Sequence, residues 1–251
     1  MRMPPDKIAD FETVKNPYGL CAMSKGVVAF PGRTLGQVKL FDFASGNVSI
    51  IPAHETPLRA LALTAKGDMV ATASEQGTLI RLWSFPSCTK LAEFRRGVDP
   101  SVIFSLAFSP LGSMVAVTSD KATLHIFNLP SGTAGQTPEA EEKTHKWGLL
   151  SKLPLLPRHF SDTYSSATTK IELGEEPEGR GPHSKSATFN AGIPGVPGGK
   201  PTQGLIGWLD DETLIVISAG QDAPWEKFKV AVDDTGKRVL TREGWKKYLE
   251  S

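Results

Sequence analysis

The sequence predicts an all-β fold, a partial β-propeller of about four blades. Two observations predict it. One pattern of short strands occurs twice at a spacing of 45 residues, and further short segments of alternating apolar and polar residues lie on both sides of this pair. Three or four short strands at such a period are the unit of a propeller blade. A chain of 251 residues with 39% hydrophobic residues is long enough to pack these strands around a core.

The repeat is clearest where residues 58–63 align with residues 103–108. The alignment continues at the same offset, without a gap, until Thr78-Leu79 meets Thr123-Leu124. Each copy contains an alternating strand, a glycine-containing turn, a strand of small residues and a third strand. Two successive blades are therefore expected, with their seam close to residue 97.

Two weaker copies flank this pair, and the polar tail over residues 241–251 is expected to form a short helix. The strands expected in the weaker copies are residues 19–23, 27–30 and 37–43 upstream, and residues 204–208, 213–217 and 225–230 downstream.

The whole chain, 1–251, is therefore interpreted as a partial propeller. One blade is assigned to residues 10–52 and one to residues 53–97. The remaining blades are assigned to residues 98–130 together with residues 204–251. Strand patterns alone leave open whether these blades close into a ring, and an open array would expose edge strands.

A long interruption over residues 131–203 separates two of these segments. Ordinary connections are a few residues long. Both ends of the interruption are small, polar or rich in Gly, Pro and Ser, which predicts a largely disordered loop. Its middle, residues 146–160, interleaves Trp, Leu and Phe with Lys, Arg and His, a composition suited to a membrane interface. The alternative is that Trp147 and Leu149 pack on the domain as a covering segment.

Two adjacent arginines, Arg95 and Arg96, lie at the seam of the repeat. Successive side chains of an extended segment point to opposite sides, so the two arginines are placed to serve two different pockets. A guanidinium group suits phosphate because it donates two parallel hydrogen bonds. The simpler alternative is a charged strand end in contact with solvent.

Hydroxyl and cationic side chains on the repeated strands are candidates to complete the two pockets. They are Thr72, Ser74 and Thr78 in the first copy, with Arg59 as a second cation, and Ser119, Lys121, Thr123 and His125 in the second copy. The alternative is that Ser and Thr occur there for their β-propensity and their cross-strand pairing.

Other function classes find little support. The net charge of +1 gives no global attraction to nucleic acid or membranes, so any anion site is local. Base-stacking aromatics in a basic groove are absent, and nucleic acid is not expected as a partner. Cys21 and Cys88 match no metal or redox spacing. No secretory signal or apolar run of spanning length is present, which predicts a soluble or peripheral cytosolic protein.

Enzyme signals are weak as well. The Gly-x-Ser-x-Gly nucleophile pattern is absent, and most carboxylates stand at turns, where Asp is common. His54 and His125 are isolated in the sequence, and the glycine-rich stretch over residues 192–199 neither follows a strand nor precedes a helix. The chain is therefore expected to be no enzyme and to need no cofactor.

The segment Phe94-Arg95-Arg96-Gly97, followed by Val98-Asp99 and residues 103–109, resembles the PROPPIN family of phosphoinositide-binding β-propellers. The family signature is Phe/Leu-Arg-Arg-Gly. The stretch Ala71-Thr72-Ala73-Ser74 and the stretch Trp225-Glu226-Lys227-Phe228 also look like family sequence. The resemblance runs from about Asp10 to the end and is greatest to fungal homologues related to the autophagy members.

This resemblance implies a seven-bladed propeller of which the chain begins near the fourth blade and lacks the first three. It also implies two headgroup sites, for phosphatidylinositol 3-phosphate or 3,5-bisphosphate. The first site would use Arg59, Thr72, Ser74, Thr78 and Arg95, and the second would use Arg96, Ser119, Lys121, Thr123 and His125. The long loop would correspond to the membrane-inserting loop of the family, with Trp147, Leu149, Leu150, Leu153 and Phe160 as inserting side chains.

The function expected from the resemblance is recruitment of autophagy or vacuolar and endosomal trafficking proteins to phosphoinositide-containing membranes. The expected location is cytoplasmic and peripheral, on vacuolar, endosomal or pre-autophagosomal membranes. The competing hypothesis is a protein-interaction scaffold in which the arginines bind acidic peptides without any dependence on lipid.

Overall fold

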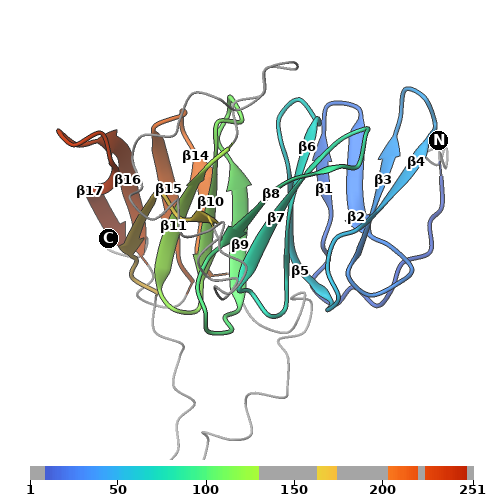
Figure 1. The fold of residues 1–251 in the computed structure, drawn as a ribbon. Helices are drawn as coiled ribbons and strands as arrows, with labels where there is room; N and C mark the ends of the chain where they lie inside the picture. Colours follow the sequence, from blue (N-terminus) through green and yellow to red (C-terminus); the bar gives the residue numbers. More distant parts are fainter. Residues whose placement is uncertain (1–8, 130–162, 174–202, 220–223, 248–251) are drawn as a thin grey trace, which may run out of the picture.

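The computed structural model describes residues 9–129, 163–173, 203–219 and 224–247. Within these residues every regular element is a β-strand, and the strands form four sheets that stand side by side (Figure 1). The sheets are called blades 1 to 4 in chain order. Blades 1 and 4 lie at opposite ends of the array, so the four described blades form an open arc (Figure 1). The predicted all-β fold with about four blades is confirmed.

The first two blades follow the chain without interruption. Blade 1 consists of β1 (Ala22–Ser24), β2 (Val27–Pro31), β3 (Gln37–Asp42) and β4 (Val48–Pro52). Blade 2 consists of β5 (Leu58–Leu63), β6 (Met69–Ser74), β7 (Leu79–Ser84) and β8 (Lys90–Arg95), and a fifth strand, β12 (Thr163–Tyr164), pairs in parallel with the outer edge of β8.

The long interruption begins after the third strand of blade 3 and ends before blade 4. Blade 3 consists of β9 (Ile103–Phe108), β10 (Met114–Ser119), β11 (Thr123–Asn128) and β13 (Ala167–Lys170). Blade 4 consists of β14 (Leu205–Trp208), β15 (Thr213–Ile217), β16 (Pro224–Val232) and β17 (Arg238–Lys247).

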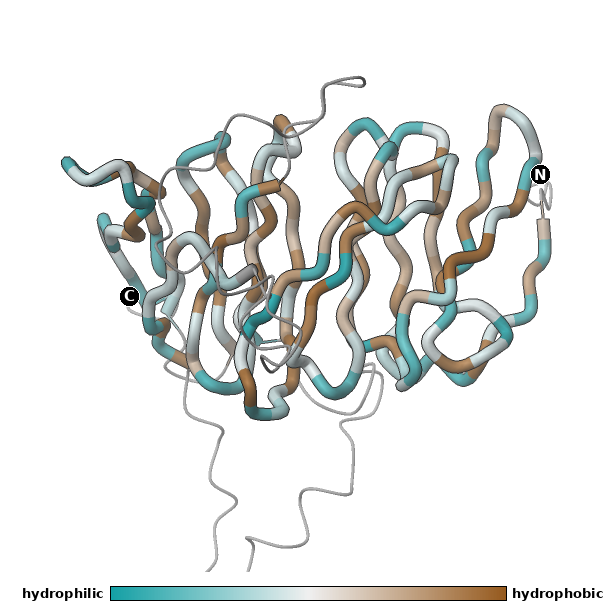
Figure 2. Tube along the Cα trace, viewed as in Figure 1, coloured by the Kyte–Doolittle hydropathy of each residue, from teal (hydrophilic) through white to brown (hydrophobic). Residues whose placement is uncertain are grey.

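Alternation of side chains along each strand divides the core into three layers, one between each pair of neighbouring blades. Ile80 and Leu82 of blade 2 pack with Phe127 of blade 3 in the middle layer. Leu124 and Ile126 point the other way and pack with blade 4. Figure 2 shows that hydrophobic residues recur along the strands of the array. Blades 2 and 3 are therefore each covered on both faces by a neighbouring blade, which is why their strands contain few exposed apolar residues.

The turns that join the second and third strands of blades 1 and 2 are glycine-dependent. Gly77 has φ +61°, and an added Cβ would lie 1.7 Å from the carbonyl oxygen of Ser101. Gly36 repeats this arrangement one blade earlier, where an added Cβ would lie 1.8 Å from the carbonyl oxygen of His54. Each turn thus packs backbone to backbone against the linker that leads to the next blade.

The pairing of strands shows that the repeat does not keep one constant offset, as the sequence alignment predicted. Ala73 pairs with Ile80 in blade 2, and Thr118 pairs with Leu124 in blade 3. The offset is therefore 45 residues for the second strand but 44 for the third. The reason is that the β6–β7 connection has one residue more than the β10–β11 connection. As a result Arg81, and not Ile80, occupies the position in blade 2 that His125 occupies in blade 3.

The structure describes strands in two segments for which the sequence predicted a loop or a helix. The loop predicted over residues 131–203 contains β12 and β13, and β13 is the outer strand of blade 3. Residues 241–247 of the expected helix instead form the second half of β17, because their backbone pairs with β16, and residues 248–251 lie outside the described residues. In both cases the hydrogen-bonding edge of a neighbouring strand decides the conformation, and short polar segments carry little periodic signal of their own.

Substituting Gly77 tests the close packing of the β6–β7 turn. Gly77→Ala is expected to lower the free energy of unfolding by about 3 kcal/mol or more, because the new methyl group meets a backbone oxygen as well as an unfavourable φ. Gly46→Ala is the matched control, since Gly46 has φ +70° and open space around it, and about 1 kcal/mol is expected. Equal losses in urea denaturation would contradict the interpretation.

Candidate phosphate-binding site

The pleat of β8 sends neighbouring side chains to different blades. Phe94 is buried and stacks on Phe127 of blade 3 with ring centroids 5.1 Å apart. Arg95 pairs with Leu79 and shares its face of the strand with Glu93, whose carboxylate accepts a hydrogen bond from Arg81. That face points to blade 1. The two arginines are therefore divided between the two faces of blade 2, as the alternation predicts.

Arg96 lies just beyond the end of β8 and turns towards blade 3. Its Nε donates to the carbonyl oxygen of Gly77 at 2.7 Å, and its Nη2 donates to the carbonyl oxygen of Asp99. The residue is 9% exposed. Burial lowers the pKa of Arg96, and the nearby Asp120 and Asp99 carboxylates oppose this shift. An arginine nevertheless keeps its charge in proteins, so Arg96 is a fixed and largely buried cation between two blades.

A row of polar side chains from blade 3 faces this cation. Ser119 and Thr123 are cross-strand partners, and their hydroxyl oxygens lie 3.2 Å apart. Thr123 Oγ1 lies 3.1 Å from His125 Nε2, and His125 Nδ1 lies 3.3 Å from the hydroxyl oxygen of Ser165. Four hydroxyl or imidazole groups thus form one continuous hydrogen-bonded row along the face of the blade.

His125 is neutral at physiological pH. Burial, and secondarily the charge of Arg96, lower its pKa to about 4. The imidazole also lies parallel to the ring of Phe127, which lines the same face. An anion bound beside His125 would raise the pKa of the imidazole, since it would partly neutralise the positive field of Arg96.

Lys121 stands at the exposed turn between β10 and β11. The same turn is fixed by Asp120, whose carboxylate accepts a hydrogen bond from the hydroxyl of Ser101. The structure therefore brings Arg96, Ser119, Thr123 and His125 of the predicted second set together, with Lys121 at the rim.

The predicted first set does not come together in this way, and Thr72 is the clearest case. Thr72 is completely buried. Its hydroxyl lies 2.9 Å from His54 Nε2, accepts from Trp83 Nε1 and donates to the carbonyl oxygen of Arg81. These three bonds use the full capacity of a hydroxyl group. Thr72 therefore joins strands and linker inside the blade, and its contact with a headgroup stays a prediction.

Arg59 is also separated from Arg95. It lies on the innermost strand of blade 2, and Arg95 lies three strands away, roughly 14 Å at the usual spacing. The Arg59 guanidinium stacks over the ring of Tyr18 at 4.1 Å, and its Nε is buried without a hydrogen-bond partner among the described residues. Burial lowers the pKa of Arg59. Its contacts are with the segment before blade 1 and not with the arginine pair.

Ser74 and Thr78 flank the β6–β7 turn, at the same end of the blade as Arg95. Ser74 is buried, and the carbonyl oxygen of Thr78 accepts the backbone N–H of Arg96 at 2.9 Å. Arg81 takes the place of His125 on this face, but Glu93 and the carbonyl oxygen of Ala53 bind it. Arg95, Ser74 and Thr78 remain the members of the first set that share one end of the blade.

Sequence reasoning missed the segment 163–171, which lies within the long interruption. Tyr164 pairs with Arg95 as part of β12, and Ser165 contacts His125 before β13 begins. The signal that pointed to it was a run of Thr, Tyr and Ile over residues 163–171, which favours extended structure. This crossing segment joins the outer edges of blades 2 and 3 (Figure 1).

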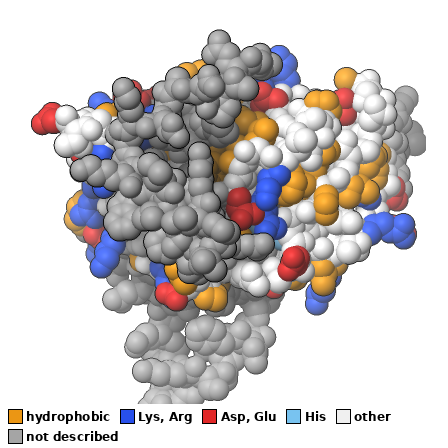
Figure 3. Space-filling view, in the orientation of Figure 1, with side chains coloured by type: hydrophobic (Ala, Val, Ile, Leu, Met, Phe, Trp, Pro, Cys, Tyr) orange, Lys and Arg blue, Asp and Glu red, His pale blue; other side chains and the backbone are white. Residues whose placement is uncertain are grey.

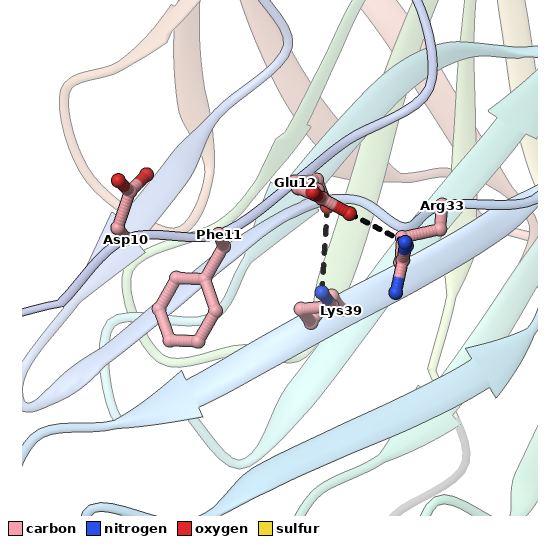
Figure 4. A pocket seen from close by; sticks show the side chains of 5 residues that line it. All are labelled: Asp10, Phe11, Glu12, Arg33 and Lys39. Atoms are coloured by element: carbon pink, nitrogen blue, oxygen red, sulfur yellow. Dashed lines mark hydrogen bonds and ion pairs between the residues drawn. The ribbon is translucent and has the colours of Figure 1, made fainter.

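A second group of charged side chains among the described residues lies on blade 1. A depression of about 500 Å³ on blade 1 is lined by Asp10, Phe11, Glu12, Arg33 and Lys39 (Figure 4). Its cations are already bound, because Arg33 pairs with Glu12 and Lys39 donates to the Glu12 carbonyl oxygen over the Phe11 ring. On the face drawn in Figure 3, the coloured Lys and Arg side chains are scattered and form no broad basic patch.

The predicted inserting side chains, Trp147, Leu149, Leu150, Leu153 and Phe160, lie outside the described residues, as does the whole segment 146–160. Among the residues that the structure does describe, no helix is long and apolar enough to cross a membrane. The same residues contain no group of three or more His, Cys, Asp or Glu side chains that could hold a metal ion.

The family profile of the PROPPINs matches residues 8–168, a stretch that includes the Arg95-Arg96 pair and the polar row. The chain belongs to the PROPPIN family. SVP1-like protein 2 of Emericella nidulans is 50% identical over 256 aligned residues, covering 99% of this chain and 78% of the relative. WD repeat domain phosphoinositide-interacting protein 2 of Gallus gallus is 46% identical over 140 residues, 53% of this chain and 32% of that protein.

Solved PROPPIN structures have the same fold. Hsv2 of Kluyveromyces lactis is 26% identical and superposes with a TM-score of 0.67, over 98% of this chain and 66% of the solved one. The chain thus spans about two thirds of that propeller.

The two buried histidines make stability depend on pH. Burial, and then the charge of Arg81, also lower the pKa of His54 to about 4. Both imidazoles are neutral when folded and protonate near pH 6.5 when unfolded, so their stabilisation is complete above about pH 6.5 and is lost as pH falls towards 4. Between pH 7.5 and pH 5, each histidine is expected to lower the free energy of unfolding, measured by urea denaturation, by on the order of 1–2 kcal/mol. His54→Gln and His125→Gln should each flatten this profile, whereas equal stability of the wild type at both pH values would contradict it.

Proposed function

We propose that this chain is a non-enzymatic membrane-recruitment module that binds phosphoinositide headgroups, phosphatidylinositol 3-phosphate or 3,5-bisphosphate. Its place of action would be the cytoplasmic surface of vacuolar, endosomal or pre-autophagosomal membranes. Its partners there would be autophagy or trafficking proteins. Membership of the PROPPIN family supports this proposal, and so does the phosphoinositide-interacting name of the relative from Gallus gallus.

The observation that carries the proposal is the juxtaposition of Arg96 with the polar row of blade 3. Two of the five guanidinium N–H groups are donated to the carbonyl oxygens of Gly77 and Asp99, which fix the plane of the fork. The other three have no acceptor among the described residues. Lys121 supplies a second cation at the rim, and the partly exposed hydroxyl oxygen of Thr123 can accept a hydrogen bond from an inositol hydroxyl. A phosphorylated ring needs this combination of fixed cations and surrounding hydrogen-bonding groups.

The second headgroup site is proposed on the opposite face of blade 2, around Arg95 with Ser74 and Thr78. Thr72 and Arg59, the other members of the predicted first set, already have partners within the protein. Two weak sites on one rigid body would still act together at a bilayer, where binding at one raises the effective concentration at the other. Segment 146–160 is proposed to add apolar contacts with the lipid interface.

Replacing both arginines tests the proposal. Arg95→Thr/Arg96→Thr is expected to abolish co-flotation with liposomes that contain phosphatidylinositol 3-phosphate, since each loss of a charge-assisted contact costs on the order of 1.5–3 kcal/mol. Arg33→Thr, an exposed arginine on blade 1, is the matched control and should float like the wild type. Equal flotation of the double variant and the wild type would refute the proposal. Binding to acidic peptides without any dependence on lipid would instead favour the scaffold hypothesis.

Changing the apolar side chains of the long interruption separates insertion from headgroup binding. Replacing Trp147, Leu149 and Leu150 with Ser is expected to reduce flotation at least several-fold, because each buried apolar side chain contributes about 1.5–3 kcal/mol. The same variant should keep the wild-type affinity for soluble inositol 1,3-bisphosphate in calorimetry. Loss of both activities together would assign the segment a role in folding.

A further inference from the structure

The crossing segment supplies the last member of the polar row. After β12 pairs with β8, the chain passes from blade 2 to blade 3 through Ser165 and Ser166 and continues into β13. Ser166 is fixed to blade 3, because its backbone N–H and its hydroxyl both donate to the carbonyl oxygen of Ile126. Ser165 is partly exposed and lies against His125. The row therefore runs from Ser119, inside the protein, to Ser165, at its surface.

Burial at the inner end sets the direction of this row. Ser119 is 0% exposed. Among the described residues, the acceptor within hydrogen-bond distance of its hydroxyl is Thr123 Oγ1. A buried hydroxyl proton without an acceptor is costly, so Ser119 donates to Thr123. Thr123 has one proton of its own, and it then donates to His125 Nε2.

The imidazole carries this direction to the surface. A neutral histidine has one acceptor nitrogen and one N–H donor. When Nε2 accepts from Thr123, Nδ1 carries the proton and donates to the hydroxyl oxygen of Ser165. The Ser165 oxygen is then occupied as an acceptor from the protein, and its own O–H is left to donate outward. Successive hydrogen bonds of one direction polarise each other, which strengthens the terminal donor.

We propose that Ser165 is a further binding residue of the second headgroup site, the outward donor of a directed Ser119–Thr123–His125–Ser165 relay, and that it contacts a phosphate oxygen of the bound ligand. The proposal rests on the proposed function. It assigns a ligand contact to the crossing segment between β12 and β13, and it gives Ser119 and His125 a role as positioning residues that act through their hydrogen bonds.

The relay direction is tested first, without any ligand. Long-range nitrogen–proton correlation spectra of the full chain should show His125 with its proton on Nδ1. Ser119→Ala removes the group that sets the direction, and it is expected to yield a mixture of the two tautomers. Ser166→Ala is the matched control from the same segment and should leave the tautomer unchanged. A wild-type proton on Nε2 would overturn the relay.

The contact itself is tested by calorimetry with soluble inositol 1,3-bisphosphate and, in a parallel arm, with inorganic phosphate. Ser165→Ala is expected to weaken the inositol bisphosphate about tenfold, the loss of one hydrogen bond to a charged group. Ser165→Thr keeps the hydroxyl and should retain most of the affinity, and Ser166→Ala should retain all of it. Equal weakening of both probes identifies a phosphate contact, as proposed.

Two outcomes would overturn the contact, and they are distinguishable. If the wild type binds inositol bisphosphate and Ser165→Ala binds it equally well, the contact is refuted and the proposed function stands. If the wild type binds neither probe, the proposed function fails and the contact fails with it. The tautomer spectra report the fold of the site in either case.

Discussion

The contact on which the site depends is the stacking of Phe94 on Phe127 between blades 2 and 3. It fixes which face of β8 points to blade 3, and the pleat then determines the rest. Arg95 is sent to the opposite face, and Arg96 returns to the interface at the point where the strand ends. An apolar pair thus decides the position of two charged groups, because the free energy of burying two aromatic rings outweighs the preference of either arginine for solvent.

These contacts orient the guanidinium group of Arg96 for anion binding before any ligand is present. Two backbone carbonyl oxygens fix its plane, and the neutral imidazole of His125 stands beside it without adding a repelling charge. Folding of the two blades offsets the free energy of desolvating the cation, so the Arg96 side chain loses little conformational freedom when an anion binds. The same desolvation that lowers the two pKa values strengthens the attraction to phosphate.

The sequence alone predicted the strands of the repeat, the turns and the division of the arginine pair, and four of the five side chains predicted for the second set lie near one another in the structure. The sequence failed where contacts depend on depth inside a blade. Thr72 and Ser119 are equally good hydroxyl candidates in sequence. Only the structure shows that Thr72 is saturated by His54 and Trp83 and that Ser119 belongs to a row that reaches the surface. The β6–β7 connection is one residue longer than the β10–β11 connection, and a gapless alignment cannot detect this difference. The alignment therefore matched Ile80 to the position of His125, which Arg81 occupies in the structure.

The sequence by itself therefore determined the fold class and the family, since the period of the strands and the Phe94–Gly97 segment are local properties of the chain. The tertiary structure decided which side chains meet. Arg59 is separated from Arg95 because it lies three strands away across the blade, and Ser165 joins His125 across 40 residues of sequence because a strand edge captures its segment. Periodicity along a chain reports which face a residue occupies, but distance across a sheet depends on strand order and on pairing, and these are set by contacts between segments far apart in sequence.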